Sequence, residues 1–203
     1  MKHHHLQTPV DQAQLAELTA GDSVTLSGRV FTCRPLTYDR VLDPDGGQEV
    51  RTQLKQLTAQ TVFHCGPLVR RISDGFEMVA MVPMPSWLAG LERIKEAVDR
   101  LELKVIIGKG ALAGLGELCK ESRCVHLVCA GNYNEYAAKV IEVIDQRWPE
   151  LGLPESMWII DVKEFGPFIV DTDMNGNSLY RGIDEDFKAD AAALLEELGI
   201  ELE

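Results

Sequence analysis

The chain has 203 residues, of which 45% are hydrophobic and 26% are charged, a composition typical of a globular protein with its own core. Its net charge of −12, with no basic run or arginine-rich aromatic segment, argues against nucleic acid as a partner. No apolar run approaches the roughly 20 residues that span a bilayer. The first residues lack a secretory signal, and the five cysteines form no CxxC pair, so we expect a reducing, cytoplasmic setting.

Apolar alternation and turn signals predict the first half of the chain. The predicted elements up to residue 82 are a short helix over 11–19, a strand over 23–33, a polar turn or mobile loop over 43–60, and strands over 61–65 and 76–82. His3, His4 and His5 precede them and are compatible with either a tag remnant or native sequence.

The second half of the chain alternates strands with helices. The clearest helix is predicted over 88–101, where five apolar residues form one stripe and Ser86 is a candidate cap. After it we predict a strand over 104–108, a helix from about Ala111, a strand over 124–131, a helix over 134–146, strands over 157–162 and 167–172, and an amphipathic helix over 184–198. This order predicts parallel strands with covering helices. We therefore expect a single α/β domain over residues 1–203, with 184–203 as an acidic C-terminal helix that is not separate.

Residues 104–114, KVIIGKGALAG, place Lys109 between Gly108 and Gly110 at the end of a predicted strand. Strand ends and helix starts meet at the ligand crevice of α/β proteins, where free N–H groups favour an anion. The Walker pattern is absent. Two interpretations remain open: an anion site that contains Lys109, or a tight turn with a solvated lysine.

Other motifs favour structural interpretations. DTDMNGN at 171–177 resembles the start of a calcium loop, but Gly182 stands where the bidentate glutamate belongs, so we predict a turn at Asn175-Gly176. His64 lies inside a strand beside a Gly-Pro break, and a structural histidine is the default interpretation. The cysteines match no common iron–sulfur ligand run, and no metal-binding pattern occurs.

Five segments in order resemble one protein family: TLSGRVFTCR, VFHCGPLVRR, KVIIGKGA, WPELGLPESMW and VKEFGPFIVDTDMNGNSLY. Together they resemble the β subunit, or C-terminal domain, of the iron–sulfur hydro-lyases, namely class I fumarate hydratase and L(+)-tartrate dehydratase. The resemblance covers roughly residues 4–180. The opening HLQTP also resembles the family, which favours native histidines.

The resemblance implies a fold and a partner. The fold is a swivelling β/β/α domain with a partly parallel sheet and helices on its outer face. The partner is an α chain that carries a [4Fe–4S] cluster on its own cysteines, in a hetero-oligomer such as α2β2. The substrate is a small dicarboxylic or hydroxy-carboxylic acid that gains or loses water. This chain itself would bind no metal.

The resemblance also implies site residues. Lys109, with Gly108 and Gly110, matches the active-site lysine segment of the family. Arg34 matches a substrate-binding arginine. Both cations would bind substrate carboxylates through charge-assisted hydrogen bonds.

The chain departs from the family pattern at the expected catalytic segment. Pro35 follows Arg34, and Tyr38 stands at a histidine position. Met84 falls on the threonine that is the family's acid/base candidate, and the paired arginine is missing. Ser86, two positions later, is the only hydroxyl close by, so the catalytic residue is unassigned.

Two functions therefore remain open. One is the β subunit of a hydro-lyase with an altered substrate or acid/base. The other is a non-catalytic relative that binds a small acid or a partner through the same pocket.

Overall fold

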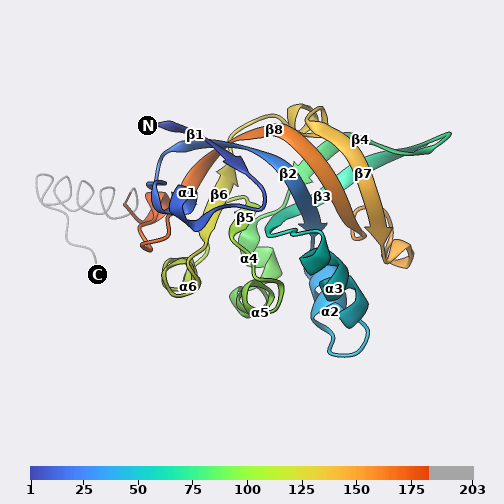
Figure 1. The fold of residues 1–203 in the computed structure, drawn as a ribbon, viewed down its shortest axis with the longest axis horizontal. Helices are drawn as coiled ribbons and strands as arrows, with labels where there is room; N and C mark the ends of the chain where they lie inside the picture. Colours follow the sequence, from blue (N-terminus) through green and yellow to red (C-terminus); the bar gives the residue numbers. More distant parts are fainter. Residues whose placement is uncertain (183–203) are drawn as a thin grey trace, which may run out of the picture.

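The computed structural model describes residues 1–182, and one eight-stranded sheet runs through this part of the chain (Figure 1). The strands follow the order β1-β2-β3-β5-β6-β8-β7, and β4 pairs with β3 outside this path. The strands are β1 His3–Gln7, β2 Ser23–Cys33, β3 Thr61–Ile72, β4 Gly75–Pro83, β5 Val105–Gly108, β6 Val125–Cys129, β7 Val140–Arg147 and β8 Met157–Thr172. The helices are α1 Gln12–Ala16, α2 Pro35–Leu42, α3 Gln48–Gln56, α4 Ser86–Ala89, α5 Leu91–Leu101, α6 Leu115–Ser122 and α7 Tyr133–Ala137, with a 3-10 turn at Pro149–Leu151.

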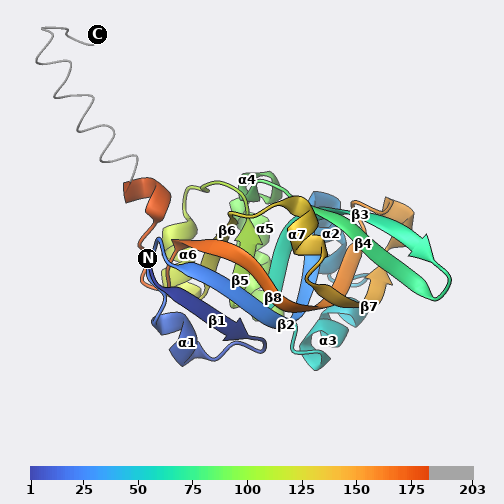
Figure 2. The ribbon, with the colours of Figure 1, turned by 90° about the horizontal axis from the view of Figure 1, so that it is seen from above.

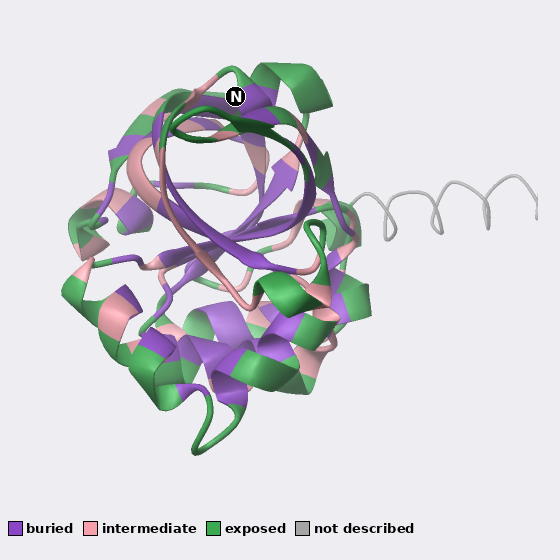
Figure 3. Ribbon diagram, turned by 90° about the vertical axis from the view of Figure 1, so that its right-hand side faces the viewer, coloured by how far each residue is buried: buried purple, intermediate pink, exposed green. Residues whose placement is uncertain are grey.

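Strand direction confirms a mixed α/β fold with a partly parallel sheet. β1, β2, β3, β5 and β6 are mutually parallel, whereas β8 is antiparallel to β2, β6 and β7. Residues 168–172 of β8 pair with β6, and residues 159–169 pair with β2, so the sheet closes on itself. Figure 3 shows the resulting ring of strands above a layer of helices.

The two faces of the parallel strands are buried in different cores. Val62 and Ile106 pack on the outer face beneath α2 to α6, whereas Phe63 and Ile107 point into the ring. This alternation follows from the two-residue period of a strand. Because both faces are buried, β5 reads as a continuous apolar run, and the buried first part of β3 is interrupted only by Thr61 and His64.

Several predicted elements are confirmed with shifted bounds, and one is wrong. The helix predicted over 134–146 ends at Ala137, and residues 140–147 form β7, which pairs with β8. Its β-branched residues Val140, Ile141, Val143 and Ile144 favour a strand, and β8 supplies the hydrogen-bonding edge.

The other differences between predicted and observed elements arise from a glycine and from pairing between distant strands. Gly90, with φ +84°, separates α4 from α5, so the helix predicted from residue 88 begins at Leu91. The strands predicted over 157–162 and 167–172 are one strand, β8, and the polar segment 43–60 contains α3.

Two further expectations concern the turn at Asn175-Gly176 and the C-terminal helix. The turn at Asn175-Gly176 is present and is closed by an antiparallel bridge between Thr172 and Ser178. The helix predicted over 184–198 lies outside the described residues. Within residues 1–182, no helix is both long and apolar enough to cross a bilayer.

Candidate functional site

The register of the parallel strands brings the sequence-predicted cations to one edge of the sheet. Cys33 of β2 aligns with His64 of β3, and Phe63 aligns with Ile107 of β5. Arg34 and Lys109, which follow these strands, are therefore two strand spacings apart, about 10 Å between backbones. We call this the carboxyl edge. Figure 2 shows β5 and β6 pointing to it, with α4 and α7 beside it.

Lys109 is exposed at the carboxyl edge. Among the described residues, no hydrogen bond or ion pair engages its ammonium group. The predicted helix N-terminus does not lie beside it, because α6 begins only at Leu115. The anion-binding potential of this turn therefore rests on the lysine charge. Gly110 has φ +71°, a conformation that favours glycine, and its Cβ position is open space.

Arg34 already has an anionic partner. Its Nε donates to Glu155 Oε1 at 2.6 Å, and both side chains are partly buried. The guanidinium lies against Gly66, where a Cβ would overlap it. The second carboxylate oxygen of Glu155 is buried without a hydrogen-bond partner. A substrate carboxylate at Arg34 would therefore share the guanidinium with Glu155.

Met84 and Ser86 occupy buried positions between the sheet and the helices. Met84 belongs to the helix-side core, and its backbone N–H donates to the His64 carbonyl. The Ser86 side chain is fully buried and does not cap a helix. Its backbone N–H donates to the carbonyl of Lys109, which ties α4 to the GKG turn. Trp87, the neighbour of Ser86, is exposed.

A buried hydrogen-bond chain passes beneath the carboxyl edge. Tyr38 Oη lies 2.7 Å from His64 Nε2, and His64 Nδ1 lies 3.0 Å from Ser86 Oγ. Ser86 Oγ lies 2.9 Å from His126 Nε2, and His126 Nδ1 lies 2.8 Å from Asp171 Oδ2. We call these five residues the Tyr38–Asp171 chain. Its members come from α2, β3, α4, β6 and β8.

The protons of this chain follow from the charge at one end. An ionised Asp171 only accepts, so His126 Nδ1 donates to it. The Ser86 hydroxyl can donate to one of the two imidazoles and accept from the other, and Tyr38 ends the chain at His64 Nε2. Every member therefore has a hydrogen-bond partner, and successive bonds polarise one another.

The electrostatics agree with this arrangement. Burial, together with the nearby His126, lowers the pKa of His64 to about 3, so this imidazole is neutral at physiological pH. Burial raises the pKa of Asp171, but hydrogen bonds from His126, Thr172 and Ser178 outweigh it and leave the pKa below its ordinary value. Burial raises the pKa of the Tyr38 phenol well above its ordinary value.

Sequence reasoning missed His126 and Asp171 and treated His64 as isolated. One signal was available for His126, because a histidine in the middle of the apolar strand VHLVC requires a polar partner when it is buried. The partner itself was not visible, because Asp171 lies 45 residues away and belongs to the segment that resembles a calcium loop. Ser86, His126 and Asp171 are hydrogen-bonded in the same succession as the serine, histidine and aspartate of a catalytic triad. The serine is buried, however, and is also hydrogen-bonded to His64, so it is not available to a substrate.

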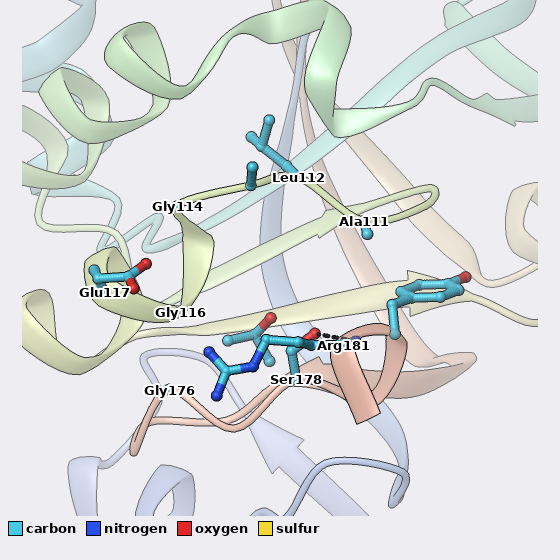
Figure 4. A pocket seen from close by; sticks show the side chains of 11 residues that line it. Ala111, Leu112, Gly114, Gly116, Glu117, Gly176, Ser178 and Arg181 are labelled. Carbon is cyan, nitrogen blue, oxygen red and sulfur yellow. Dashed lines mark hydrogen bonds between the residues drawn. The ribbon is translucent and has the colours of Figure 1, made fainter. Parts of the chain in front are cut away.

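A cavity of about 770 Å³ lies between the loop after Lys109 and the segment that follows β8 (Figure 4). Ala111 and Leu112 line one side, and Ser178 and Arg181 line the other. Neither Lys109 nor Arg34 lines it. Because the sequence-predicted cations Lys109 and Arg34 both lie outside this cavity, we place the candidate site at the carboxyl edge.

No group of three or more histidine, cysteine, aspartate or glutamate side chains within residues 1–182 is arranged to hold a metal ion. All five cysteines are free thiols. Cys119 and Cys124 have sulfurs 3.9 Å apart in the helix-side core, whereas Cys129 packs against the core inside the ring. The cysteines of this chain therefore do not fit a three-thiolate cluster site.

Comparison with known proteins adds a family match. Residues 1–183 match the family described as Fumarase C-terminus. The chain is 34% identical over 178 residues to the L(+)-tartrate dehydratase subunit beta of Escherichia coli K12, which covers 86% of this chain and 85% of that protein. It is 27% identical over 173 residues to a putative L(+)-tartrate dehydratase subunit beta of Methanocaldococcus jannaschii, covering 83% of this chain and 87% of that protein.

A third relative is a longer chain. The chain is 30% identical over 186 residues to a putative fumarate hydratase class I of Geobacillus stearothermophilus. The match covers 89% of this chain but only 34% of that protein. In the Geobacillus protein, the region similar to this chain is therefore joined to a much larger remainder.

Proposed function

Since this chain belongs to the Fumarase C-terminus family, we propose that it is the β subunit of an iron–sulfur-dependent hydro-lyase in the cytoplasm. In this role it adds water to, or removes water from, a small hydroxy-acid together with a cluster-bearing α chain. The proposal is supported by two relatives named as β subunits of L(+)-tartrate dehydratase and by one named as a class I fumarate hydratase.

The observation that carries the proposal is the exposed Lys109 at the carboxyl edge. Its ammonium group binds a substrate carboxylate, and Gly110, whose Cβ position is open space, lets the acid approach the backbone. Gly108, by contrast, is buried against Ser86 and does not contact the acid. Arg34 contributes a second cation two strands away, shared with Glu155. These contacts orient the acid but transfer no proton.

Ser86 does not serve as the acid or base in this conformation. It is fully buried, and its hydroxyl is bonded to two imidazoles. Met84 has no exchangeable proton. We therefore assign carboxylate binding, rather than proton transfer, to this chain.

The α chain holds the [4Fe–4S] cluster, which supplies a Lewis acid for the substrate hydroxyl when it is bound. The domain swivels to bring its carboxyl edge over that partner and to exclude water from the bound acid. A stable association of this kind makes the pair a hetero-oligomer.

The class is tested by anaerobic purification of the chain from its own cells, with iron and sulfide assayed in the eluate. We expect a brown co-purifying chain and hydro-lyase activity in the eluate. A colourless chain recovered alone overturns the subunit role. That result favours the second candidate, a non-catalytic acid-binding relative. Met84 supports this candidate, because it stands at the position where the family's threonine is expected.

The site is tested by Lys109→Ala in the purified assembly. We expect L(+)-tartrate binding to weaken by about 1.5–3 kcal/mol, the scale of a hydrogen bond to a charged group. Titration calorimetry measures it, and Lys95→Ala, which removes another exposed lysine from α5, is the matched control. Equal affinities in both variants would remove Lys109 from the site.

A further inference from the structure

A basic cavity lies in the helical layer, away from the carboxyl edge. It has a volume of about 380 Å³ and is lined by Gln48, Arg51, Thr52, Lys55 and Arg100. Three of these side chains are cationic, and none of the described residues that line the cavity is acidic. Because the chain as a whole has a net charge of −12, the basic cavity is a local reversal of its charge. Such a reversal raises the local concentration of anions.

Two helices bring the three cations together. Arg51 and Lys55 are four residues apart on α3, so they share one face of that helix. Arg100 lies in the last turn of α5, which contacts α3. An ion pair of 2.7 Å between Lys55 and Glu102 joins the ends of the two helices. The basic cavity therefore lies between α3 and α5, and their contact sets the spacing of its cations.

The basic cavity and the carboxyl edge lie toward opposite ends of the parallel strands. α3 leads into the start of β3, and α5 leads into the start of β5. Lys55 and Arg100 stand a few residues before these starts, whereas Lys109 follows the carboxyl end of β5. Neither Lys109 nor Arg34 lines the basic cavity. A ligand in it would therefore not occupy the place assigned to the substrate acid.

Arg51 is held in the wall of the basic cavity without a carboxylate. Its Nη1 donates to the carbonyls of Val41 and Asp43 at 2.6 and 2.7 Å, and its Nη2 donates to the carbonyl of Pro44 at 2.9 Å. Gly47 packs so closely that a Cβ there would overlap Nη1. These contacts fix the guanidinium but do not compensate its charge, and no ion pair among the described residues engages it. Two N–H donors, one on Nε and one on Nη2, remain for the oxygens of an anion.

The other two cations have partners that an anion can replace. Lys55 pairs with Glu102, and Arg100 pairs with Glu96 at 2.8 Å. All four side chains reach solvent. Ion pairs at this exposure add little to stability, because water already solvates both charges. Lys55 and Arg100 can therefore turn to a more highly charged ligand at little cost.

We propose that the basic cavity binds a soluble small molecule that carries two adjacent phosphate groups. Arg51, Lys55 and Arg100 are spread over two helices, which suits a diphosphate better than one phosphate group. The guanidinium donors of Arg51 match phosphate oxygens, and the ammonium of Lys55 adds a point charge. A phosphorylated lipid headgroup offers the same chemistry, but the net charge of −12 repels an anionic membrane surface.

The test is titration calorimetry of the full chain with sodium pyrophosphate, in a magnesium-free buffer of low ionic strength. Lys55→Gln and Arg100→Gln each remove one cation from the basic cavity. Lys95→Gln removes an exposed lysine of α5 that does not line it, and Lys109→Gln reports on binding at the carboxyl edge. Arg51 is kept, because its loss would also release the three carbonyls that it holds.

Glu102→Gln tests the same site in the opposite direction. This variant frees Lys55 from its ion pair and removes a negative charge from beside the cavity. We expect it to bind pyrophosphate at least about twofold more tightly than the unsubstituted chain. A purely structural role of Lys55 does not predict such a gain.

We expect Lys55→Gln and Arg100→Gln each to weaken pyrophosphate binding at least about fivefold, and Lys95→Gln and Lys109→Gln to leave it unchanged. Pyrophosphate should also raise the thermal unfolding midpoint of the unsubstituted chain, and by less in the two cavity variants, whose transitions show that they are folded. Equal affinities in all variants, no saturable binding at millimolar pyrophosphate, or a loss in Lys109→Gln alone overturns the inference. Binding only to vesicles that contain phosphatidylinositol bisphosphate would overturn the soluble ligand.

Discussion

At the residue scale, the carboxyl edge combines an exposed cation with a buried hydrogen-bond network. Lys109 is exposed, and the Tyr38–Asp171 chain lies beneath it, joined to it through the Ser86 N–H, which donates to the Lys109 carbonyl. Burial lowers the pKa of His64 to about 3, so this imidazole adds no positive charge near the edge at physiological pH.

His64 makes stability depend on pH. Its pKa is about 3 in the folded protein and about 6.5 when unfolded, so between these values the unfolded chain binds the extra proton. Stability from this group is therefore full above pH 6.5 and falls as the pH drops toward 3, by roughly 1.4 kcal/mol per pH unit.

Urea unfolding at pH 7, 6, 5 and 4 measures this dependence. We expect a shallower loss of unfolding free energy in His64→Gln than in the unsubstituted protein. His5→Gln removes an exposed histidine and should follow the unsubstituted curve. Parallel curves for His64→Gln and the unsubstituted protein would show that His64 is protonated in the fold.

At the element scale, the end of β5 is where the backbone and the buried chain meet. Gly108 lacks a side chain because a Cβ there would overlap the Ser86 hydroxyl and approach His64 Nδ1 at 3.2 Å. Strand β5 can therefore lie directly against α4. This contact fixes both the GKG turn and the start of α4.

Gly108→Ala should destabilise the protein by about 1–3 kcal/mol, the usual cost of overpacking. The backbone conformation of Gly108 accepts alanine, so the cost comes from the displaced Ser86 hydroxyl. Chemical denaturation gives the value. Gly182→Ala, where the Cβ meets no atom of the described residues within 4 Å, is the matched control, and equal stability of the two variants would contradict the close approach.

At the scale of the whole molecule, one sheet separates two cores. The core inside the ring and the core beneath the helices share the strands β2, β3, β5 and β8. Adjacent residues of one strand belong to different cores, so neither core can be lost while the other persists. We therefore expect residues 1–182 to unfold as one cooperative unit.

Ile106→Ala and Ile107→Ala test this unity, because these neighbours are fully buried on opposite faces of β5. We expect each to lower the free energy of unfolding by about 2–5 kcal/mol. The near-ultraviolet and far-ultraviolet dichroism transitions should coincide in both variants. Two separate transitions in either variant would mean that the cores unfold independently.

The local pattern of the sequence determined much of the fold. Alternating and continuous apolar runs located β2, β3, β5, β6 and β8, and the glycine spacing located the turn that presents Lys109. The family resemblance rested on ordered motifs and is confirmed by the match over residues 1–183. These features depend on neighbouring residues, which a sequence displays directly.

Tertiary structure decided the roles of segments and side chains whose partners lie far away in the sequence. Segment 140–147 became β7 because β8 offered it an edge. Ser86 became a link between two imidazoles because α4 lies over β3 and β6, and Arg34 found Glu155, which is 121 residues away. Local propensity could not show these pairings, because burial and hydrogen bonding across the sheet set them.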